Sequence, residues 1–267
     1  MTNYGDALGH GHDTAGRPGR IVSLVPSLTE ALFAFGVGQR VVGITRYCVE
    51  PASEVVDIPK VGGTKDVDVD IVLGLKPDLV IANIEENTRD DIERLVDAGA
   101  NVLVTYPRTV LAAIDELHVL ADLTGAEDQA AEALADAASE LRTAPGYPGV
   151  RVFCPIWRRP WMTIGPDTYI HDMIRVCGGE NIYGDAKDRY PEVRLADVRA
   201  REPQIVLLPD EPFRFRPKHA QEVIDELGPV RIHFVDGKDL CWYGPRIASA
   251  IRSLGRLLQG DSVDSEL

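Results

Sequence analysis

VDIVLGLKPDLVIANIE (residues 69–85) is matched later in the chain by LADVRAREPQIVLLPDE (residues 195–211), and the two stretches align without a gap. Both place a proline, Pro77 or Pro203, between a helical pattern and an apolar run, and both end on a glutamate. The residue before a proline is biased away from the helical conformation, so each stretch predicts a short helix, a break and a strand. The repeat, at an offset of 126 residues, predicts two related lobes.

Short apolar runs alternate with helical patterns over the rest of the chain. The runs at Val41–Ile44, Val102–Thr105 and Val150–Phe153 are rich in valine, isoleucine and leucine, which is typical of parallel strands covered on both faces. Residues 109–142 show no strand pattern and predict two helices that break at Thr124-Gly125. The alternation predicts an α/β fold with two lobes of mainly parallel sheets, a helical connector and a ligand cleft between the lobes.

These patterns divide the chain into five segments. We expect a disordered tail over residues 1–19, an N-terminal lobe over 20–107, a helical connector over 108–147, a C-terminal lobe over 148–260 and a short tail over 261–267. The first segment is polar and rich in glycine, and this composition favours disorder.

The composition is that of an acidic globular protein, with 45% hydrophobic residues and a net charge of −14. Nucleic acid and anionic membrane surfaces are disfavoured as partners because the chain has no basic stripe. No apolar run reaches the roughly 20 residues of a membrane span. The first residues do not follow the pattern of a secretion signal, and the four cysteines form no C-x-x-C pair. We therefore expect a reduced, cytoplasmic location.

Candidate binding residues follow from the predicted fold class. In open α/β sheets, ligands bind beyond the carboxyl ends of the strands, so the loops after the strands define the site. These loops contain all three tryptophans and most of the paired charges. The candidates are Tyr47, Cys48, Glu85, Glu86, Trp157, Arg158, Arg159, Trp161, Glu211, Trp242, Tyr243 and Arg246.

CPIWRRPWM, residues 154–162, concentrates two tryptophans and two arginines directly after an apolar strand. We expect Trp157 and Trp161 to line the cleft. The two arginines are expected to contact the ligand, to pair with Glu85, Glu86 or Glu211 across the cleft, or to remain solvated on the surface.

Several other residues have simpler explanations. Ser27 and Glu30 fit a capping box at a helix start. Glu85 and Glu86 also fit a role in which they only complement the positive end of the following helix. Cys48 lies in a polar turn, where a thiolate could act as a nucleophile or as a soft metal ligand, although an inert thiol is favoured since no histidine adjoins it. No motif indicates a catalytic centre or a metal site, so we expect no catalytic residue, no resident metal and no cofactor.

Three stretches in their order resemble the vitamin B12-binding and ferric-siderophore-binding proteins, the helical-backbone receptors of ABC importers. They are RIVSLVPSLTEALFAFGVGQRVVGIT (20–45), IPKVGGTKDVDVDIVLGLKPDLVIA (58–82) and VCGGENIYGD (176–185). The resemblance extends over residues 20–258 and implies two α/β lobes joined by one long, rigid helix, with the ligand held between them. Residues 127–142 would form that helix.

The resemblance also implies roles for individual residues. Tyr47 and Tyr190 correspond to aromatic contacts of the vitamin B12 receptor, whereas Thr64 stands where that receptor has a tryptophan. Receptors of this kind present one carboxylate from each lobe to the membrane partner. Asp70 corresponds to the first of these positions, but the second is Ala196. We therefore expect a cytoplasmic binder for which an ABC importer is a doubtful partner.

Three functions from different classes fit these observations. The first is a non-enzymatic binding protein for a metal chelate of the cobalamin, siderophore or haem type, a large, flat and partly aromatic ligand. The second is an enzyme or metal-handling protein on the same fold, with Cys48, Glu85 and Glu86 as its working groups. The third uses the cleft as a docking surface for a protein. We expect the first.

Overall fold

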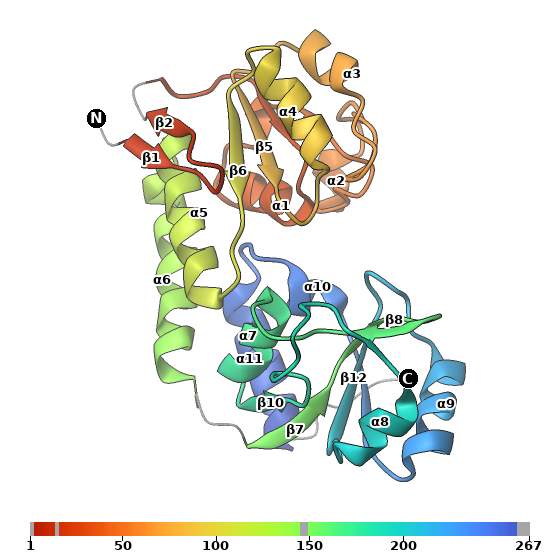
Figure 1. Cartoon of the computed structure of the whole chain (residues 1–267). Coiled ribbons are helices and arrows are strands. Elements are labelled where there is room, and N and C mark those ends of the chain that lie inside the picture. Colours follow the sequence, from red (N-terminus) through yellow and green to blue (C-terminus); the bar gives the residue numbers. More distant parts are fainter. Residues whose placement is uncertain (1–2, 14–15, 145–148, 261–267) are drawn as a thin grey trace. The chain divides into compact units, whose positions relative to one another are not determined.

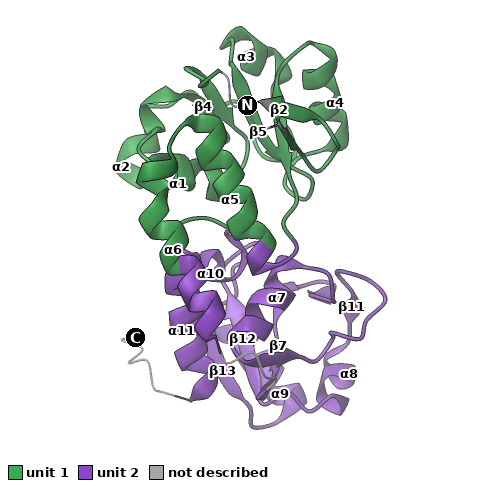
Figure 2. Cartoon of the chain, turned by 90° about the vertical axis from the view of Figure 1, so that its left-hand side faces the viewer, with its two compact units in different colours: residues 1–107, 112–136, 243–245 green, residues 108–111, 137–242, 246–267 purple. Residues whose placement is uncertain are grey.

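The computed structural model describes residues 3–13, 16–144 and 149–260 and divides them into two compact units. Unit 1 comprises residues 1–107, 112–136 and 243–245, and unit 2 comprises residues 108–111, 137–242 and 246–267 (Figure 2). The α/β fold class predicted from the sequence is confirmed. No helix in the described ranges is long and apolar enough to cross a membrane.

Unit 1 is built on a four-stranded parallel sheet in the order β4-β3-β5-β6 (Figure 1). Its strands are β3 (Ile21–Ser23), β4 (Val41–Ile44), β5 (Leu79–Asn83) and β6 (Val102–Thr105). The helices α1 (Pro26–Ala34), η1 (Gly38–Arg40), α2 (Ala52–Val55), α3 (Val69–Gly74) and α4 (Arg89–Asp97) fill the connections. Apolar side chains of α3 and α4 pack with those of the sheet in one cluster, which includes Val72, Leu95 and Val80.

Unit 2 repeats this arrangement with a parallel sheet in the order β10-β7-β12-β13. Its strands are β7 (Val150–Phe153), β10 (Gly179–Asn181), β12 (Ile205–Pro209) and β13 (Arg231–Val235). Its helices are α7 (Tyr169–Val176), α8 (Leu195–Ala200), α9 (Pro217–Leu227), α10 (Gly237–Cys241) and α11 (Ile247–Gln259). A small antiparallel sheet, β11-β9-β8, is added from β8 (Pro155–Trp157), β9 (Trp161–Thr163) and β11 (Glu192–Val193).

The repeat found in the sequence is present in the structure. Helix α8 begins and ends 126 residues after α3, and strand β12 has the same offset from β5. Even the break is reproduced, because Lys76 and Glu202 both adopt a φ of 48° in front of their prolines. Their N–H groups donate to the carbonyls of Leu73 and Arg199, 3.0 Å away in both units. In each sheet, the strand that comes second along the chain lies at one edge and is followed by the first, third and fourth strands. The two units therefore share one topology.

Two helices follow β6, as the sequence predicts. Helix α5 covers Val110–Thr124 and α6 covers Glu127–Thr143, with the break at Gly125, whose φ is 63°. Residues of α6 up to 136 are assigned to unit 1 and those from 137 onward to unit 2, so a single helix carries the chain from one unit to the other.

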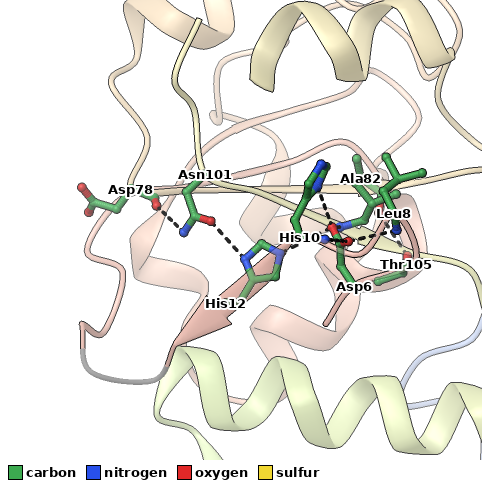
Figure 3. Close-up of polar contacts among 9 residues, drawn as sticks. Asp6, Leu8, His10, His12, Asp78, Ala82, Asn101 and Thr105 are labelled. Atoms are coloured by element: carbon green, nitrogen blue, oxygen red, sulfur yellow. Dashed lines mark hydrogen bonds and ion pairs between the residues drawn. The ribbon is translucent and has the colours of Figure 1, made fainter. Parts of the chain in front are cut away.

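The N-terminal segment differs from the expectation of a disordered tail. Strands β1 (Asn3–Gly5) and β2 (Gly11–Asp13) form an antiparallel hairpin. The prediction is wrong for these residues because the polar side chains of Asp6 and His12, which the composition counted toward disorder, make hydrogen bonds to unit 1 (Figure 3). The other tail, 261–267, lies outside the described residues.

Candidate functional site

Glu85 and Glu86 lie in a turn after β5 that a buried asparagine holds in place. Asn83 Oδ1 accepts the N–H of Glu85 at 2.7 Å and that of Glu86 at 3.2 Å, and Lys65 Nζ donates to the Glu85 carbonyl at 2.6 Å. Both glutamates are partly exposed. Helix α4 has its own cap, Thr88, and acidic residues in its first turn. Because this cap completes the helix start, the two glutamates remain candidates for ligand contact.

Tyr47 and Cys48 follow β4 and have opposite environments. Tyr47 is 52% exposed, and the guanidinium of Arg46 lies 5.2 Å from the centre of its ring. Cys48 is 1% exposed, and its Sγ accepts a hydrogen bond from Thr29 Oγ1 at 3.1 Å. Burial raises the pKa of the Cys48 thiol. Cys48 turns inward while its polar neighbours occupy the surface, and a buried thiol of raised pKa agrees with the inert role favoured in the sequence analysis.

The capping box expected at Ser27 is also absent. Helix α1 begins at Pro26, its N-cap is Val25, and no side chain accepts a hydrogen bond there. Ser27 therefore lies within the first turn. It is 2% exposed, and its hydroxyl has no hydrogen-bond partner among the described residues. Glu30 is only partly buried and lies in the helix interior.

Tyr243 is buried in unit 1, beside a glutamate that the sequence analysis did not select. Burial raises the pKa of the Tyr243 phenol well above its ordinary value, and the carboxylates of Glu86 and Glu116 add to this rise. Glu116 lies on α5, where its Oε1 accepts the N–H of Tyr106 at 3.0 Å. Its other oxygen is buried with no hydrogen-bond partner in the described part of the chain, and burial raises the pKa of Glu116 to about 7.

One signal could have identified Glu116 in the sequence. It falls three residues after Ala113 and four before Leu120, and both of these side chains are buried. A glutamate among the apolar residues on the buried face of a helix predicts a carboxyl with an altered pKa.

In unit 2, the tryptophans of the stretch 154–162 belong to an aromatic cluster that runs from the core to the surface. Trp161 stacks on Phe215 at 5.8 Å between ring centres, and Phe213 meets Phe215 edge-on at 4.9 Å. Trp157 meets Phe213 edge-on at 5.6 Å and is 43% exposed. His219 contacts both phenylalanines. Trp157 is therefore the exposed end of the cluster, whereas Trp161 is half-buried and supports it.

The two arginines of this stretch differ in the same way. Arg158 binds Glu222 through two hydrogen bonds of 2.7 and 2.8 Å, and its guanidinium lies 5.8 Å from the centre of the Trp161 ring. Of the alternatives left open for Arg158, the structure shows an ion pair, but with Glu222 in unit 2 and not with Glu85, Glu86 or Glu211. Glu222 was missed because it comes from α9, far along the chain. Arg159 is exposed at the hairpin tip, with a φ of 70°.

Glu211 belongs to a group of three carboxylates at the ends of β12 and β13. One carboxylate oxygen from each of Asp210, Glu211 and Asp236 lies within 4.8 Å of the other two. The N–H of Gly237 donates to Asp210 Oδ1 at 2.8 Å. Burial raises the pKa of Glu211, and the charge of Asp210 adds to this rise. Close like charges and burial both favour a proton on Glu211.

Trp242 and Arg246 pack against each other at the start of α11. The Trp242 ring is 6% exposed and lies 5.4 Å from Lys238 Nζ and 5.6 Å from the Arg246 guanidinium. Glu211 makes a hydrogen bond with Trp242 that opposes the rise in the Glu211 pKa. Trp242 is therefore buried between two cations, and only a small edge of its ring reaches the surface.

Tyr190 is 36% exposed and lies beside a charged group that the sequence analysis missed. The Arg189 guanidinium is 5.4 Å from the centre of the Tyr190 ring, and Arg189 Nε donates to the Asp167 carbonyl at 2.8 Å. Arg108 Nη1 donates to the Asp167 carboxylate at 2.8 Å. Arg189, Asp167 and Arg108 are distant from one another in the sequence, and no local pattern connects them.

The two positions expected to meet a membrane partner both lie on exposed short helices. Asp70 is in the first turn of α3, which Asp68 caps. Ala196 is exposed in the first turn of α8. The neighbouring Asp197 is bound by Arg194 at 2.7 and 2.8 Å.

Known proteins resemble this chain over most of its length. It is 27% identical over 192 residues to the vitamin B12-binding protein of Vibrio cholerae serotype O1, covering 70% of this chain and 69% of that protein. The crystal structure of the periplasmic vitamin B12 binding protein BtuF of Vibrio cholerae superposes with a TM-score of 0.78, at 23% identity, over 91% of this chain and 97% of that one. The periplasmic heme-binding protein RhuT from Roseiflexus sp. RS-1 gives a TM-score of 0.74, at 24% identity, over 88% and 96%.

Both of these solved proteins are described as periplasmic in their names. The cytoplasmic location expected from the sequence therefore has no support from them. Residues 21–227 of this chain match the family described as periplasmic binding protein, and this range includes the strands β3 to β12. The chain therefore belongs to the periplasmic binding protein family.

Proposed function

We propose that this protein is a binding protein for a metal chelate of the cobalamin, haem or siderophore type and that it delivers the chelate to an ABC importer. The observation that carries the proposal is the family match over 21–227, together with relatives named for vitamin B12 and haem binding. Two units of the same topology, each with aromatic and charged residues after its strands, agree with this function.

The exposed aromatic rings favour a large and flat ligand. Tyr47 in unit 1 and Trp157 and Tyr190 in unit 2 keep between 36% and 52% of their surface exposed. Each ring also lies beside at least one aromatic or arginine partner within its own unit. Rings fixed in this way lose little conformational freedom when a planar ligand covers them.

The enzyme alternative is less favoured by the structure. Its proposed nucleophile, Cys48, is buried, and the pKa of its thiol is raised, so the reactive thiolate is disfavoured. Glu85 and Glu86 are held by backbone contacts in a turn rather than placed beside a nucleophile.

The doubt about an importer is not supported by the comparisons, since the relatives are named as periplasmic binding proteins. Asp70 is exposed and suited to docking from unit 1. The equivalent helix of unit 2 offers Asp197, which Arg194 already binds, so we infer weaker docking from that side. A location outside the cytoplasmic membrane agrees with this role.

The first experiment identifies the ligand. The full chain, purified from its source organism without a denaturing step, is examined by absorption spectroscopy and native mass spectrometry. A corrin, haem or ferric-siderophore spectrum that matches a bound mass of that chelate supports the proposal. A bound metabolite without metal, released as a changed product, would favour the enzyme alternative instead.

A further inference from the structure

The N-terminal hairpin covers the edge strand of the unit 1 sheet. Strand β6 ends the order β4-β3-β5-β6, so one of its sides has no neighbouring strand in that sheet. The N–H of Ala7 donates to the Val104 carbonyl at 2.9 Å, and the N–H of Val104 donates to Asp6 Oδ2 at 3.1 Å. The turn of the hairpin thereby occupies hydrogen-bonding groups that an exposed edge would offer to another chain.

Asp6 is the central residue of this contact (Figure 3). Its side chain is 0% exposed. Besides the Val104 N–H, its carboxylate accepts the N–H groups of Leu8 at 2.9 Å and His10 at 2.8 Å. His10 Nδ1 and His12 Nε2 lie 3.2 and 3.4 Å from Asp6 Oδ2. A buried carboxylate with this many donors stays charged, and the pKa of Asp6 is lowered by these hydrogen bonds even though burial alone would raise it.

His12 faces a hydrogen-bond acceptor with each of its ring nitrogens. Nε2 faces Asp6, and Nδ1 lies 3.0 Å from Asn101 Oδ1 (Figure 3). The orientation of the Asn101 amide is set because its Nδ2 donates to the Asp78 carbonyl at 3.2 Å. A neutral imidazole has one N–H and satisfies one acceptor, whereas the imidazolium has two and satisfies both. His12 is 4% exposed, so its ring has little access to water.

We propose that a proton held on His12 latches the N-terminal hairpin to unit 1 and that loss of this proton loosens the hairpin from β6. When His12 is neutral, a nitrogen lone pair faces either Asn101 Oδ1 or Asp6 Oδ2, and one of the two contacts is lost. The hairpin then keeps its contact at Ala7 and the hydrogen bond from Tyr4 to Asp122 on α5. The edge of β6 becomes available to another strand when the hairpin leaves.

Two charged side chains lie near the His12 ring. The Asp6 carboxylate faces its Nε2, and Arg17 lines a cavity of about 360 Å³ together with His12. His10 shares the Asp6 carboxylate. The Asp78 carboxylate, on the opposite side of Asn101, is occupied by the N–H groups of Gly19 and Arg20 at 2.9 Å. The two hydrogen bonds of His12 therefore decide the state of the latch.

Nitrogen-15 NMR of the histidine side chains tests the protonation state directly. In the folded full chain at about pH 5.5, the latch requires both ring nitrogens of His12 to carry protons. His12→Gln assigns the signal. A neutral tautomer of His12 at that pH, in protein whose hairpin remains protected from exchange, would overturn the proposal.

Hydrogen exchange followed by mass spectrometry tests the release. From about pH 5.5 to about pH 8.5, after correction for intrinsic exchange rates, the protection of residues 3–13 and of β6 should fall about tenfold in the parent protein, in line with the loss of one hydrogen bond to a charged group. His12→Gln should remove this pH dependence. His118→Gln, a change at an exposed histidine on α5, should retain it. Equal pH dependence in the parent and in His12→Gln, or none in the parent, would refute the latch.

Discussion

At the scale of single residues, Trp157 and Trp161 differ in exposure and in their aromatic contacts. Trp157 has an exposed ring held by Phe213, whereas Trp161 is stacked within the cluster. The sequence alone did not predict this difference, because both residues are tryptophans and lie four positions apart. Alternation along the two strands of a bulged hairpin decides which ring faces the surface, and the bulge between Pro155 and Trp157 cannot be seen in the sequence.

The first prediction concerns Trp157. Trp157→Ala should weaken binding of the chelate by about 1.4–2.8 kcal/mol, roughly tenfold to a hundredfold, because the variant loses a fixed aromatic surface. Isothermal titration with the chelate that co-purifies measures the change. Phe234→Ala is the matched control, since Phe234 is 50% exposed on β13 and is not among the candidate site residues. Equal affinities of both variants and the parent would show that Trp157 does not contact the ligand.

The second prediction concerns Glu116. Its folded-state pKa of about 7 lies above the ordinary value of 4.5, so the folded state holds this proton more tightly than the unfolded state. The contribution to stability is complete below about pH 4.5 and is lost as the pH rises through about 7, by at most about 3 kcal/mol. Glu116→Gln keeps an acceptor for the Tyr106 N–H and should remove this loss.

Urea unfolding at about pH 5 and pH 8 measures the effect of Glu116→Gln. The variant should gain stability relative to the parent at the higher pH and differ little at the lower pH. Asp115→Asn is the control, because Asp115 is the exposed neighbour on the same helix. If both variants change the free energy of unfolding equally at each pH, the cause is the loss of a surface charge and not the buried carboxyl of Glu116.

At the scale of single elements, the sequence predicted the long strands and helices well because their apolar patterns are continuous. Val41–Ile44, Val102–Thr105 and Val150–Phe153 have the predicted bounds. The small sheet β11-β9-β8 and the hairpin β1-β2 were missed. Strands of two or three residues are too short to produce a periodic pattern.

The third prediction concerns the loop that ends the small sheet. A Cβ added at Gly165 would lie 2.1 Å from the Asp188 carbonyl oxygen, which is backbone and cannot turn away. Gly165→Ala should therefore lower the free energy of unfolding by about 1–3 kcal/mol. Gly255→Ala on α11, where the added Cβ would meet no described heavy atom within 4 Å beyond its chain neighbours and the backbone of its own helix, should raise it by about 0.5–1 kcal/mol. Denaturant unfolding of both variants compares the signs, and a stable Gly165→Ala would contradict the observed loop.

At the scale of the whole molecule, the repeat in the sequence predicted the most. Helix, break and strand recur at one offset, and both sheets have the same strand order. The loops after the strands were correctly located, but the environments of their side chains were not, because burial depends on contacts between distant segments. Cys48 turned inward and Trp242 was covered for this reason, whereas Glu116 could have been found from its place on the buried face of α5.

The fourth prediction concerns the importer. If Asp70 docks through its charge, Asp70→Asn should reduce stimulation of the ATPase of a reconstituted cobalamin-type importer by roughly tenfold. Ala196→Glu should increase it, because it adds a carboxylate on the equivalent exposed helix of unit 2. Asp66→Asn is a control at another surface aspartate, which pairs with Arg46. No stimulation by any of these proteins would separate the binding function from this class of importer.

The most direct test of the central claim is calorimetric titration of the full chain, freed of any co-purified ligand, with cyanocobalamin, haemin and a ferric siderophore in turn. The account predicts that one of these chelates binds saturably with one site per chain and a Kd of about 1 μM or tighter. It also predicts that the chelate is recovered unchanged. Absence of saturable binding by every corrinoid, haem and ferric siderophore tried, with the protein folded throughout, would contradict the account.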